Sequence, residues 1–425
     1  MATKSLRMKF EVYNIHSGIK KSLAEFGFKR PTDIQHRAIT PILAGEDVLA
    51  IAQTGTGKTA AFAIPVLHLI SEIKKHSRDQ SIKCLVMVPT RELSIQITEV
   101  FEKLAKYTDI SVMSLVGGVA QEPQINQLKN GVDILVSTPG RMFDLIYQGH
   151  IKITKTEILV LDEADHMLDL GFNKDIHDVI KFLPKKHQTL FFSATITPTI
   201  KELAYELVNK PIRIQISPKD PISKNVDHSV AFIEMDDKRF FLERMIKEKA
   251  DSRILVFVRT KVRAERVHLA MSRVGIKTVT MHGGKEQEDR LAVMKDFKEG
   301  RVNVLIATDI SARGIDIANV EYVVNYDLPD VSENYVHRVG RTGRGVSKGF
   351  AVSFCSKEEE PILREIESFV GKPIKVIEMG NEEYKETIVF SEEIKDNWKA
   401  LMKEAEKEEK ALEAKGIKWK KHKKK

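Results

Sequence analysis

The chain has 425 residues, of which 42% are hydrophobic, 30% are charged and only two are cysteines. This length predicts two or three domains, and the hydrophobic fraction excludes a wholly disordered chain. Two cysteines exclude a disulfide-stapled scaffold and a four-ligand zinc site. No apolar run is long enough to span a membrane, and the N-terminal residues lack a secretory signal. We therefore expect a soluble protein of a reducing compartment, the cytoplasm.

The net charge of +8 is concentrated at the C-terminal end. Residues 415–425 contain seven lysines and no acidic residue, which leaves about +1 for the rest of the chain. The basicity is therefore a property of the tail and not of the body. If the body binds a nucleic acid, the contacts have to come from local clusters of residues.

Short β-branched runs alternate with helix-period stretches along the first half of the chain. The predicted strands are residues 47–53, 82–89, 133–138, 157–162 and 189–195. Their apolar residues are consecutive and do not alternate with polar ones, which is typical of parallel strands buried on both faces between helices. The first half is therefore predicted to be an α/β domain.

A proline-bearing segment then interrupts the pattern. Residues 211–226 contain Pro211, Pro218 and Pro221, which is typical of a linker. The alternation resumes with predicted strands at residues 254–260, 277–283, 302–309, 320–329 and 349–355. The fold class we predict is α/β, with two parallel sheets in tandem joined by a short linker and followed by a basic C-terminal tail.

Residues 52–59, AQTGTGKT, lie between the first predicted strand and a helical stretch. They match the phosphate-binding pattern G-x-x-x-x-G-K-[ST], except that Ala52 or Gln53 stands where the first glycine is usual. Backbone N–H groups of such a loop surround phosphate oxygens, while Lys58 would bind the β and γ phosphates and Thr59 would bind Mg²⁺. The residues predicted to bind the nucleotide here are Ala52, Gln53, Thr54, Gly55, Thr56, Gly57, Lys58 and Thr59.

An acidic sequence follows the strand predicted at residues 157–162. The strand delivers Asp162 and Glu163 at its C-terminal end, where open α/β sheets bind ligands. Asp162 would hold Mg²⁺, directly or through water, and Glu163 is the candidate base that polarises the attacking water. Together with the phosphate-binding loop, these acids predict hydrolysis of a nucleoside triphosphate.

Three motifs in the expected order point to a family. DEAD at 162–165, SAT at 193–195 and HRVGRTGR at 337–344 resemble motifs of the DEAD-box RNA helicases of superfamily 2, and the resemblance covers roughly residues 8–375. It implies two RecA-like domains, with ATP as substrate, Mg²⁺ as cofactor and RNA as partner. The segments that it implies are an N-terminal segment (1–38), an ATP-binding domain (39–214), a linker (215–226), a C-terminal helicase domain (227–378) and a charged tail (379–425).

The resemblance also implies how ATP is recognised. Residues 27–35, GFKRPTDIQ, resemble the family's Q motif, in which the amide of Gln35 would donate to and accept from adenine. Guanine would mismatch such an amide, so ATP is the expected nucleotide. The residues that the resemblance places around the base and the ribose are Phe10, Phe28, Lys29 or Pro31, and Asp316.

Catalytic and coupling roles follow from the same resemblance. Arg341 and Arg344 would be arginine fingers on the γ-phosphate, where bidentate pairing stabilises transition-state charge. The catalytic residues implied are Glu163, Arg341, Arg344 and Lys58. The residues implied to link the ATP state to a closed, RNA-bound form are Asp165, Ser193, Thr195 and His337.

RNA contacts are implied in both domains. They come from loops in which glycines, backbone N–H groups and single arginines bind the sugar-phosphate chain without reading bases. We therefore expect sequence-independent binding of a single strand or a short duplex. The residues implied are Thr90, Arg91, Gly118, Thr138, Arg141, Arg290, Thr308 and Gly314, while Asp309 helps to order its loop.

The two halves of the implied ATP site lie in different domains. ATP is fully coordinated only when the interdomain cleft closes, and RNA loops from both domains favour the same closure. The resemblance implies that closure over a bent single strand separates a short duplex locally, without processive unwinding, or remodels an RNA–protein complex. The alternatives are an ATP-gated RNA clamp and a DNA-unwinding translocase, which turnover with RNA and with DNA would separate.

The tail leaves two interpretations open. Trp419 among the terminal lysines suits stacking on single-stranded RNA, and the same segment suits a disordered, solubilising tail. The short N-terminus and basic tail look most like the bacterial RhlE-type helicases. We expect a monomeric core, while the sequence identifies neither the physiological RNA nor any protein partner.

Overall fold

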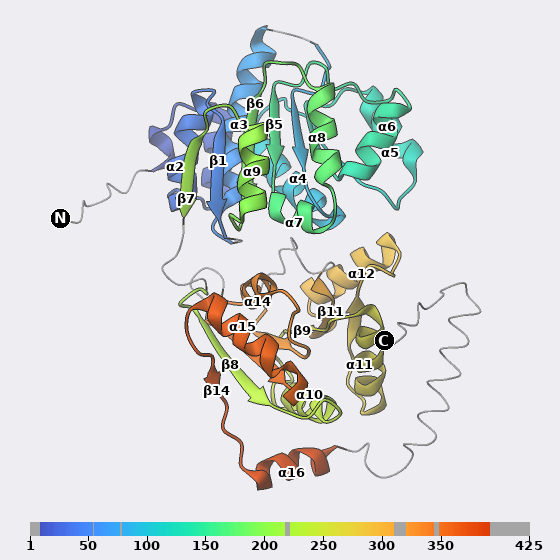
Figure 1. Cartoon of the computed structure of the whole chain (residues 1–425). Helices are drawn as coiled ribbons and strands as arrows, with labels where there is room; N and C mark the ends of the chain where they lie inside the picture. The colour runs from blue at the N-terminus through green and yellow to red at the C-terminus, as the bar shows by residue number, and fades with distance from the viewer. Residues whose placement is uncertain are drawn as a thin grey trace, which may run out of the picture.

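The computed structural model describes residues 9–53, 55–76, 79–216, 222–309, 320–343 and 348–391. Two α/β units are seen in Figure 1, the first coloured blue to green and the second yellow to red. Each unit contains one sheet of seven strands, and the strand pairs are parallel. The predicted fold class is confirmed. Most of the predicted tail, residues 392–425, lies outside the described residues.

The first sheet has the strand order β3-β4-β2-β5-β6-β1-β7. Its five inner strands are buried along their whole length, as expected of strands covered by helices on both faces, whereas the two edge strands carry partly exposed residues. The strands are β1 (Val48–Ala52), β2 (Cys84–Met87), β3 (Val112–Leu115), β4 (Ile134–Ser137), β5 (Ile158–Leu161), β6 (Gln188–Ser193) and β7 (Ile212–Ile216).

Several helices of the first unit begin in the loops that follow its strands. Thr90 caps α4 after β2, because its Oγ1 accepts a hydrogen bond from Leu93 N at 3.3 Å. Thr197 caps α9 after β6 through Ile200 N, also at 3.3 Å. The helices are η1 (Phe10–Val12), α1 (Ser17–Glu25), α2 (Asp33–Leu43), α3 (Lys58–His76), α4 (Arg91–Ala105), α5 (Gln121–Lys129), α6 (Pro139–Tyr147), α7 (Ala164–Asp169), α8 (Asn173–Phe182) and α9 (Pro198–Leu207).

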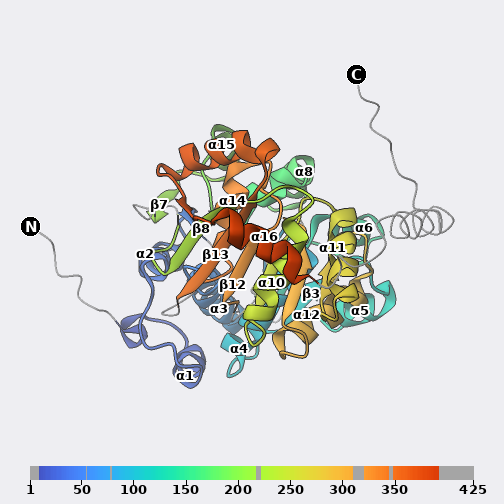
Figure 2. The ribbon, with the colours of Figure 1, turned by 90° about the horizontal axis from the view of Figure 1, so that it is seen from below.

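The second sheet has the strand order β10-β11-β9-β12-β13-β8-β14. Its strands are β8 (Val226–Phe232), β9 (Ile254–Phe257), β10 (Val279–Met281), β11 (Val304–Ala307), β12 (Tyr322–Asn325), β13 (Gly349–Cys355) and β14 (Lys375–Val376). Its helices are α10 (Lys238–Glu248), α11 (Lys261–Arg273), α12 (Gln287–Lys298), α14 (Ser332–Val339), η2 (Lys357–Glu359), α15 (Glu360–Val370) and α16 (Asn381–Phe390). The last helix of the described residues, α16, packs on α10 (Figure 2).

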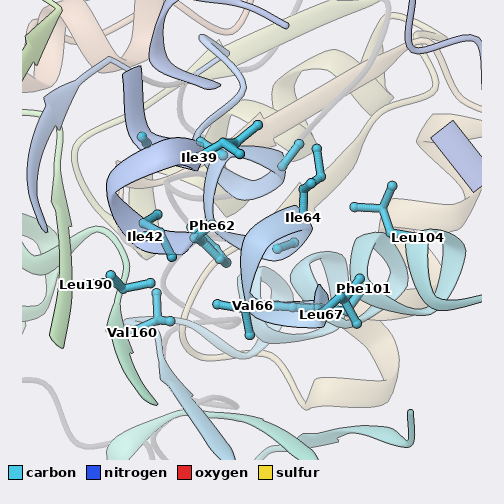
Figure 3. Close-up of a cluster of buried hydrophobic side chains, with 14 of the residues drawn as sticks. Ile39, Ile42, Phe62, Ile64, Val66, Leu67, Phe101, Leu104, Val160 and Leu190 are labelled. Atoms are coloured by element: carbon cyan, nitrogen blue, oxygen red, sulfur yellow. The ribbon is translucent and has the colours of Figure 1, made fainter. Parts of the chain in front are cut away.

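The core of the first unit lies on both faces of its sheet. On one face, Ile39 of α2, Phe62 of α3 and Phe101 of α4 pack with Val160 and Leu190 of the strands (Figure 3). Successive strand residues point to opposite faces, so a second apolar cluster forms on the other side of the same strands. The continuous apolar runs in the sequence are explained by this two-sided burial.

Both cysteines are buried free thiols, Cys84 in β2 and Cys355 in β13. Burial raises the pKa of each thiol, so neither is ionised at neutral pH. No helix within the described ranges is long and apolar enough to cross a membrane.

Candidate functional site

The phosphate-binding loop lies between β1 and α3. Gly57 has a φ angle of 96°, in the left-handed region that glycine adopts without strain. A Cβ atom at this position would also stand 2.5 Å from Gln35 Nε2. Thr56 Oγ1 donates a hydrogen bond to Gln53 O at 2.7 Å and closes the loop on itself. The loop therefore has the turn that the sequence predicts, and Thr54 lies outside the described residues.

Lys58 begins α3 with only 6% of its surface exposed. Its Nζ makes no hydrogen bond to any residue that the structure describes. A buried ammonium group requires anions nearby, because an unpaired buried charge is strongly unfavourable. Asp162 and Glu163 supply part of that negative charge. The phosphate oxygens of a nucleotide would supply the hydrogen-bond acceptors.

Gln35 ties α2 to the phosphate-binding loop. Its Oε1 accepts a hydrogen bond from Thr32 N at 3.0 Å, and its Nε2 donates one to Gly57 O at 3.2 Å. Phe10 is buried, and its ring centroid lies 6.4 Å from that of the partly exposed Phe28. The structure thus places Gln35 beside the phosphate-binding loop. It also brings together Phe10 and Phe28, the two aromatic rings predicted to lie around the base.

Asp162 and Glu163 follow β5, and both are buried. Burial raises the pKa of Asp162 to about 6, with Lys58 opposing the shift. Burial would also raise the pKa of Glu163, but His166, Lys58 and Arg341 together hold it at about 2. His166 Nδ1 lies 3.5 Å from Glu163 Oε2. Glu163 is therefore ionised at neutral pH and can accept a hydrogen bond from a water molecule.

Glu163 also has a strained backbone. Its φ angle is 52°, a left-handed conformation that costs a non-glycine residue about 1–2 kcal/mol. The peptide is held there by a hydrogen bond from Glu163 N to Asp162 Oδ1 at 3.0 Å, and α7 begins at the next residue. Strain of this kind persists where the surroundings enforce it, which is common at functional sites.

Asp165 connects the acids to the loop after β6. Its Oδ2 accepts hydrogen bonds from Ala194 N at 3.0 Å, from Thr195 N at 2.9 Å and from Thr195 Oγ1 at 3.0 Å. Ser193 Oγ donates to Thr195 O at 2.8 Å. Three of the four predicted coupling residues therefore share one hydrogen-bonded cluster.

The second unit supplies the opposite wall of the site. A cavity of about 280 Å³ is lined by Glu163, Asp165 and Thr195 from the first unit and by His337 and Arg341 from the second. Arg341 is only 2% exposed and lowers the pKa of Glu163, so its charge acts across the boundary between the units. Two predicted residues of this wall, Arg344 and Asp316, lie outside the described part of the chain.

Arg338 precedes these arginines and is held inside the second unit. It is 1% exposed, and its Nε and Nη2 donate to the two carboxylate oxygens of Asp309 at 2.6 and 2.8 Å. Its Nη1 donates to Asp327 O at 2.7 Å. A bidentate buried pair fixes orientation strongly, so Arg338 positions α14 against the end of β11.

The predicted RNA-binding residues of the first unit lie in the loops that follow the carboxyl ends of three strands. We call this edge of the sheet the RNA edge. Gly118 follows β3, Thr138 and Arg141 follow β4, and Thr90 follows β2, and these three strands are neighbours. Arg91 packs so closely on Gly118 that a Cβ atom there would overlap its guanidinium. Arg141 Nη2 donates at 3.0 Å to a backbone carbonyl of the loop that holds Gly118. The structure therefore brings all five together.

The same edge meets α12 of the second unit. Arg290 Nη2 lies 3.0 Å from Glu92 Oε1, to which Gln287 Nε2 also donates at 3.0 Å. Arg91 Nη1 donates to Gln287 Oε1 at 3.4 Å. Glu92 is 4% exposed and was not among the predicted residues, because nothing local marks a partner so far along the chain. Of the other predicted RNA residues, Thr308 is buried after β11 and Gly314 lies outside the described residues.

Family models match most of the chain. The model of the DEAD/DEAH box helicases matches residues 32–203, and that of the helicase conserved C-terminal domain matches residues 237–346. The chain is 39% identical over 378 residues to the ATP-dependent RNA helicase RhlB of Shewanella piezotolerans, covering 88% of this chain and 86% of that one. It is 38% identical over 364 residues to the ATP-dependent RNA helicase CshA of Listeria monocytogenes, covering 86% and 69%. The names of these two relatives, RhlB and CshA, differ from that of the RhlE-type subgroup.

Solved structures show the same arrangement of elements. S. cerevisiae Dbp5 bound to RNA and ADP BeF3 matches with a TM-score of 0.78 and 30% identity, over 90% of this chain and 98% of that chain. Mss116p bound to single-stranded RNA and AMP-PNP matches with a TM-score of 0.82 and 27% identity, over 91% and 82%. Both of those structures hold RNA and a nucleotide together.

Proposed function

Because the chain belongs to the DEAD/DEAH box helicase family, we propose that its two units close on ATP and RNA together and separate short RNA duplexes locally. The protein is an ATP-dependent RNA helicase, an enzyme that hydrolyses ATP and binds RNA. One observation carries the proposal. Glu163 of the first unit and Arg341 of the second line one cavity between the units, and the charge of the buried Lys58 acts on Glu163.

Each group at this site has a distinct role in hydrolysis. Lys58 binds the β and γ phosphates, and the ionised Glu163 orients the attacking water by accepting its hydrogen bond. Arg341 stabilises the charge that develops on the γ-phosphate, a contribution typically worth 10³–10⁵ in rate. Arg344 is the proposed second arginine finger, and Asp316 the proposed ribose contact.

Mg²⁺ fits the residues that are present. Asp162 offers a buried carboxylate and Thr59 a hydroxyl, which are the oxygen donors that Mg²⁺ prefers. So few protein ligands leave room for phosphate oxygens and waters, the usual arrangement in nucleotide sites. Bound there, the ion would neutralise charge on the β and γ phosphates.

RNA is proposed to bind along the edge formed by the ends of β2, β3 and β4. That edge contains backbone N–H groups, Gly118 in a left-handed conformation, and the side chains of Arg91 and Arg141. These groups are suited to phosphate oxygens and not to base edges. Binding is therefore expected to be independent of sequence. The edge continues onto α12 of the second unit through Arg290.

Closure couples the two ligands. The ATP site and the RNA edge each draw residues from both units, so each ligand stabilises the same closed arrangement and raises the affinity of the other. A strand bent to fit the closed edge excludes its complement, which supports local and non-processive separation. An RNA clamp without turnover is the alternative, and the ionised Glu163 beside Arg341 favours turnover.

The test is ATP hydrolysis with and without single-stranded RNA, comparing the wild type with Glu163→Gln. We expect strong stimulation by RNA, weaker stimulation by DNA, and a fall in kcat of about 10²–10⁴-fold in the variant. ATP-dependent RNA binding should persist in the variant, because the phosphate contacts of Lys58 remain.

A matched control is Glu365→Gln, at an exposed position of α15, which should hydrolyse ATP like the wild type. If RNA does not stimulate ATP hydrolysis by the wild type, the proposed coupling between RNA binding and ATP hydrolysis is wrong. Tight ATP-dependent RNA binding without turnover would instead identify a clamp.

We propose a linker within residues 215–226. Its first two residues belong to β7 (Ile212–Ile216), which pairs with β1, and its last residue begins β8 (Val226–Phe232). We propose a monomeric core and a cytoplasmic location, the latter on the two reduced, buried cysteines.

A further inference from the structure

The segment between β12 and α14 is fixed by side chains from distant parts of the second unit. Residues 326–328 leave β12 and lead toward α14. Lys238 Nζ, from α10, donates to Tyr326 O at 2.8 Å. Glu359 Oε1, from η2, accepts from Leu328 N at 3.1 Å. Both side chains lie outside every motif found in the sequence.

Two arginines complete this fixation. Arg338 Nη1 donates to Asp327 O at 2.7 Å, and Arg259 Nη2 donates to Leu328 O at 3.1 Å. Arg259 Nε also lies 3.1 Å from Asp330 Oδ1, two residues before α14 begins. Every peptide carbonyl from residue 326 to residue 328 is therefore bound by a cationic side chain.

Glu359 connects these contacts to one another. It is 2% exposed, and its Oε1 also accepts from Arg259 Nη2 at 3.0 Å. Its Oε2 accepts from Ser356 N at 3.1 Å and pairs with Lys238 Nζ. One carboxylate thus joins the ends of β9, β12 and β13, which are neighbouring strands of the sheet.

Stability alone does not account for the buried pair of Lys238 and Glu359. Lys238 is completely buried, and burial lowers its pKa, a sign that the site disfavours the charge. Replacing a buried ion pair by apolar groups of the same size is often neutral or stabilising. What an apolar pair would not supply is the hydrogen bonds to Tyr326 O and Leu328 N. The pair is therefore explained by the backbone positions that it fixes, those of Tyr326 and Leu328.

That geometry reaches the ATP site through α14. The helix runs from Ser332 to Val339, and Arg341 follows it, with Arg341 N donating to Arg338 O at 3.0 Å. Arg341 Nε also donates to His337 O at 3.2 Å. A shift of residues 326–330 would carry this short, stiff helix and move the guanidinium relative to Glu163.

We propose that Lys238 and Glu359 are positioning residues, which set the place of Arg341 by fixing the segment before α14. The inference rests on the proposed role of Arg341 at the γ-phosphate. Neither residue touches ATP. We expect the two residues to affect kcat and not KM, because the chemical step tolerates little displacement of a transition-state contact.

The test is the double variant Lys238→Met with Glu359→Met, in which both side chains keep nearly their size and lose their charge and their hydrogen-bonding atoms. We expect a folded protein whose Tm is unchanged or raised, a KM for ATP within about twofold of the wild type, and an RNA-stimulated kcat at least about tenfold lower. Hydrogen exchange at Leu328 N should become faster, while exchange in β13 stays the same. A merely structural role would instead lower the Tm and leave the kcat of the folded molecules intact.

A matched control removes an exposed pair from the same unit. Arg364 and Glu360 lie 3.5 Å apart on the surface of α15, so Arg364→Met with Glu360→Met should change neither kcat nor KM. A double-mutant cycle that combines the Lys238 and Glu359 substitutions with Arg341→Ala gives the decisive comparison. If Lys238 and Glu359 act through Arg341, adding their substitutions to Arg341→Ala should lower kcat no further.

The outcomes separate the two proposals. Wild-type kcat in the Lys238 and Glu359 variant, with hydrolysis lost in Arg341→Ala, overturns the positioning role alone. Fully additive losses overturn it too, because they would show an action independent of Arg341. Undiminished hydrolysis in Arg341→Ala overturns both the arginine finger and the residues said to position it.

Discussion

The pKa values of two adjacent buried carboxylates, Asp162 and Glu163, are shifted in opposite directions although burial raises both. The pKa of Asp162 rises to about 6, while that of Glu163 falls to about 2, because His166 and Arg341 lie beside the second acid only. Opposed shifts of neighbouring acids are how one site assigns different roles to similar groups. His166 and Lys58 of the first unit lower the pKa of Glu163 most, and Arg341 of the second unit adds to that lowering in the closed arrangement.

Gly118 is the residue on the RNA edge that tolerates a side chain least. It has a φ angle of 74°, and a Cβ atom there would overlap Arg91 Nη1. Gly118→Ala should therefore displace Arg91 and weaken RNA binding by about tenfold, the effect of losing about 1.4 kcal/mol. ATP affinity without RNA should not change. Binding of labelled single-stranded RNA, with and without ATP analogue, measures the effect.

Gly149 provides the matched control, because its φ angle is 79° and a Cβ atom there would meet nothing within 4 Å. Gly149→Ala has the same left-handed strain without the overlap, so it should lose stability as Gly118→Ala does and keep its RNA affinity. Equal losses of RNA affinity in the two variants would assign the effect to backbone strain.

Among the elements, α16 is the one attached farthest from the site. It packs on α10, and in Figure 1 it lies at the end of the second unit away from the first. The ring centroids of Tyr384 and Phe241 are 4.9 Å apart. Tyr384 Oη donates to Asp237 Oδ2 at 2.8 Å and accepts from Glu234 N at 3.1 Å. Tyr384 is thus one of several attachments of this helix, beside the contacts of Thr387 with Arg244 and of Ser391 with Glu243.

Tyr384→Phe keeps the ring contact and removes both hydrogen bonds. Each is worth about 1 kcal/mol, so the amides of α16 should exchange roughly 5–30 times faster while RNA-stimulated hydrolysis stays at the wild-type level. Tyr147→Phe, at a position 71% exposed, should change neither quantity. A parallel loss of hydrolysis in Tyr384→Phe would show that α16 communicates with the ATP site.

At the scale of the whole molecule, the two units are joined on the RNA side by one buried carboxylate. Glu92 accepts from Gln287 and pairs with Arg290, whose side chain is only 12% exposed. Opening the cleft would return both charges to water. The pair therefore favours closure only while it is complete, since a buried charge that has lost its partner is strongly destabilising.

Glu92→Gln should consequently reduce the coupling between ATP and RNA. The factor by which RNA raises the affinity for ATP should fall by about tenfold or more, while ATP binding without RNA and the Tm stay the same. Titrations of ATP analogue with and without RNA give that factor directly. Glu102→Gln, at an exposed position of α4, is the matched control. An unchanged coupling factor would mean that the contact follows closure and does not favour it.

The sequence pattern predicted the features that depend on residues close together in the chain. The continuous apolar runs predicted parallel sheets because both faces of each inner strand are buried, and the loop before Lys58 and the acids after β5 stand where strand ends place them. The contacts of Glu92 with α12 and of Glu359 with Lys238 could not be predicted. Each joins residues more than a hundred positions apart, and such pairs are chosen by the packing of whole elements.

The two thiols described with the fold give the molecule a built-in reporter. Cys84 lies in the sheet of the first unit and Cys355 in that of the second, both buried, and the chain has no other cysteine. A thiol reagent can reach either sulfur only when its own sheet opens. The rates at which the two are labelled therefore measure the opening of each unit separately, in the unmodified protein, and would show which unit yields first when heat or denaturant unfolds it.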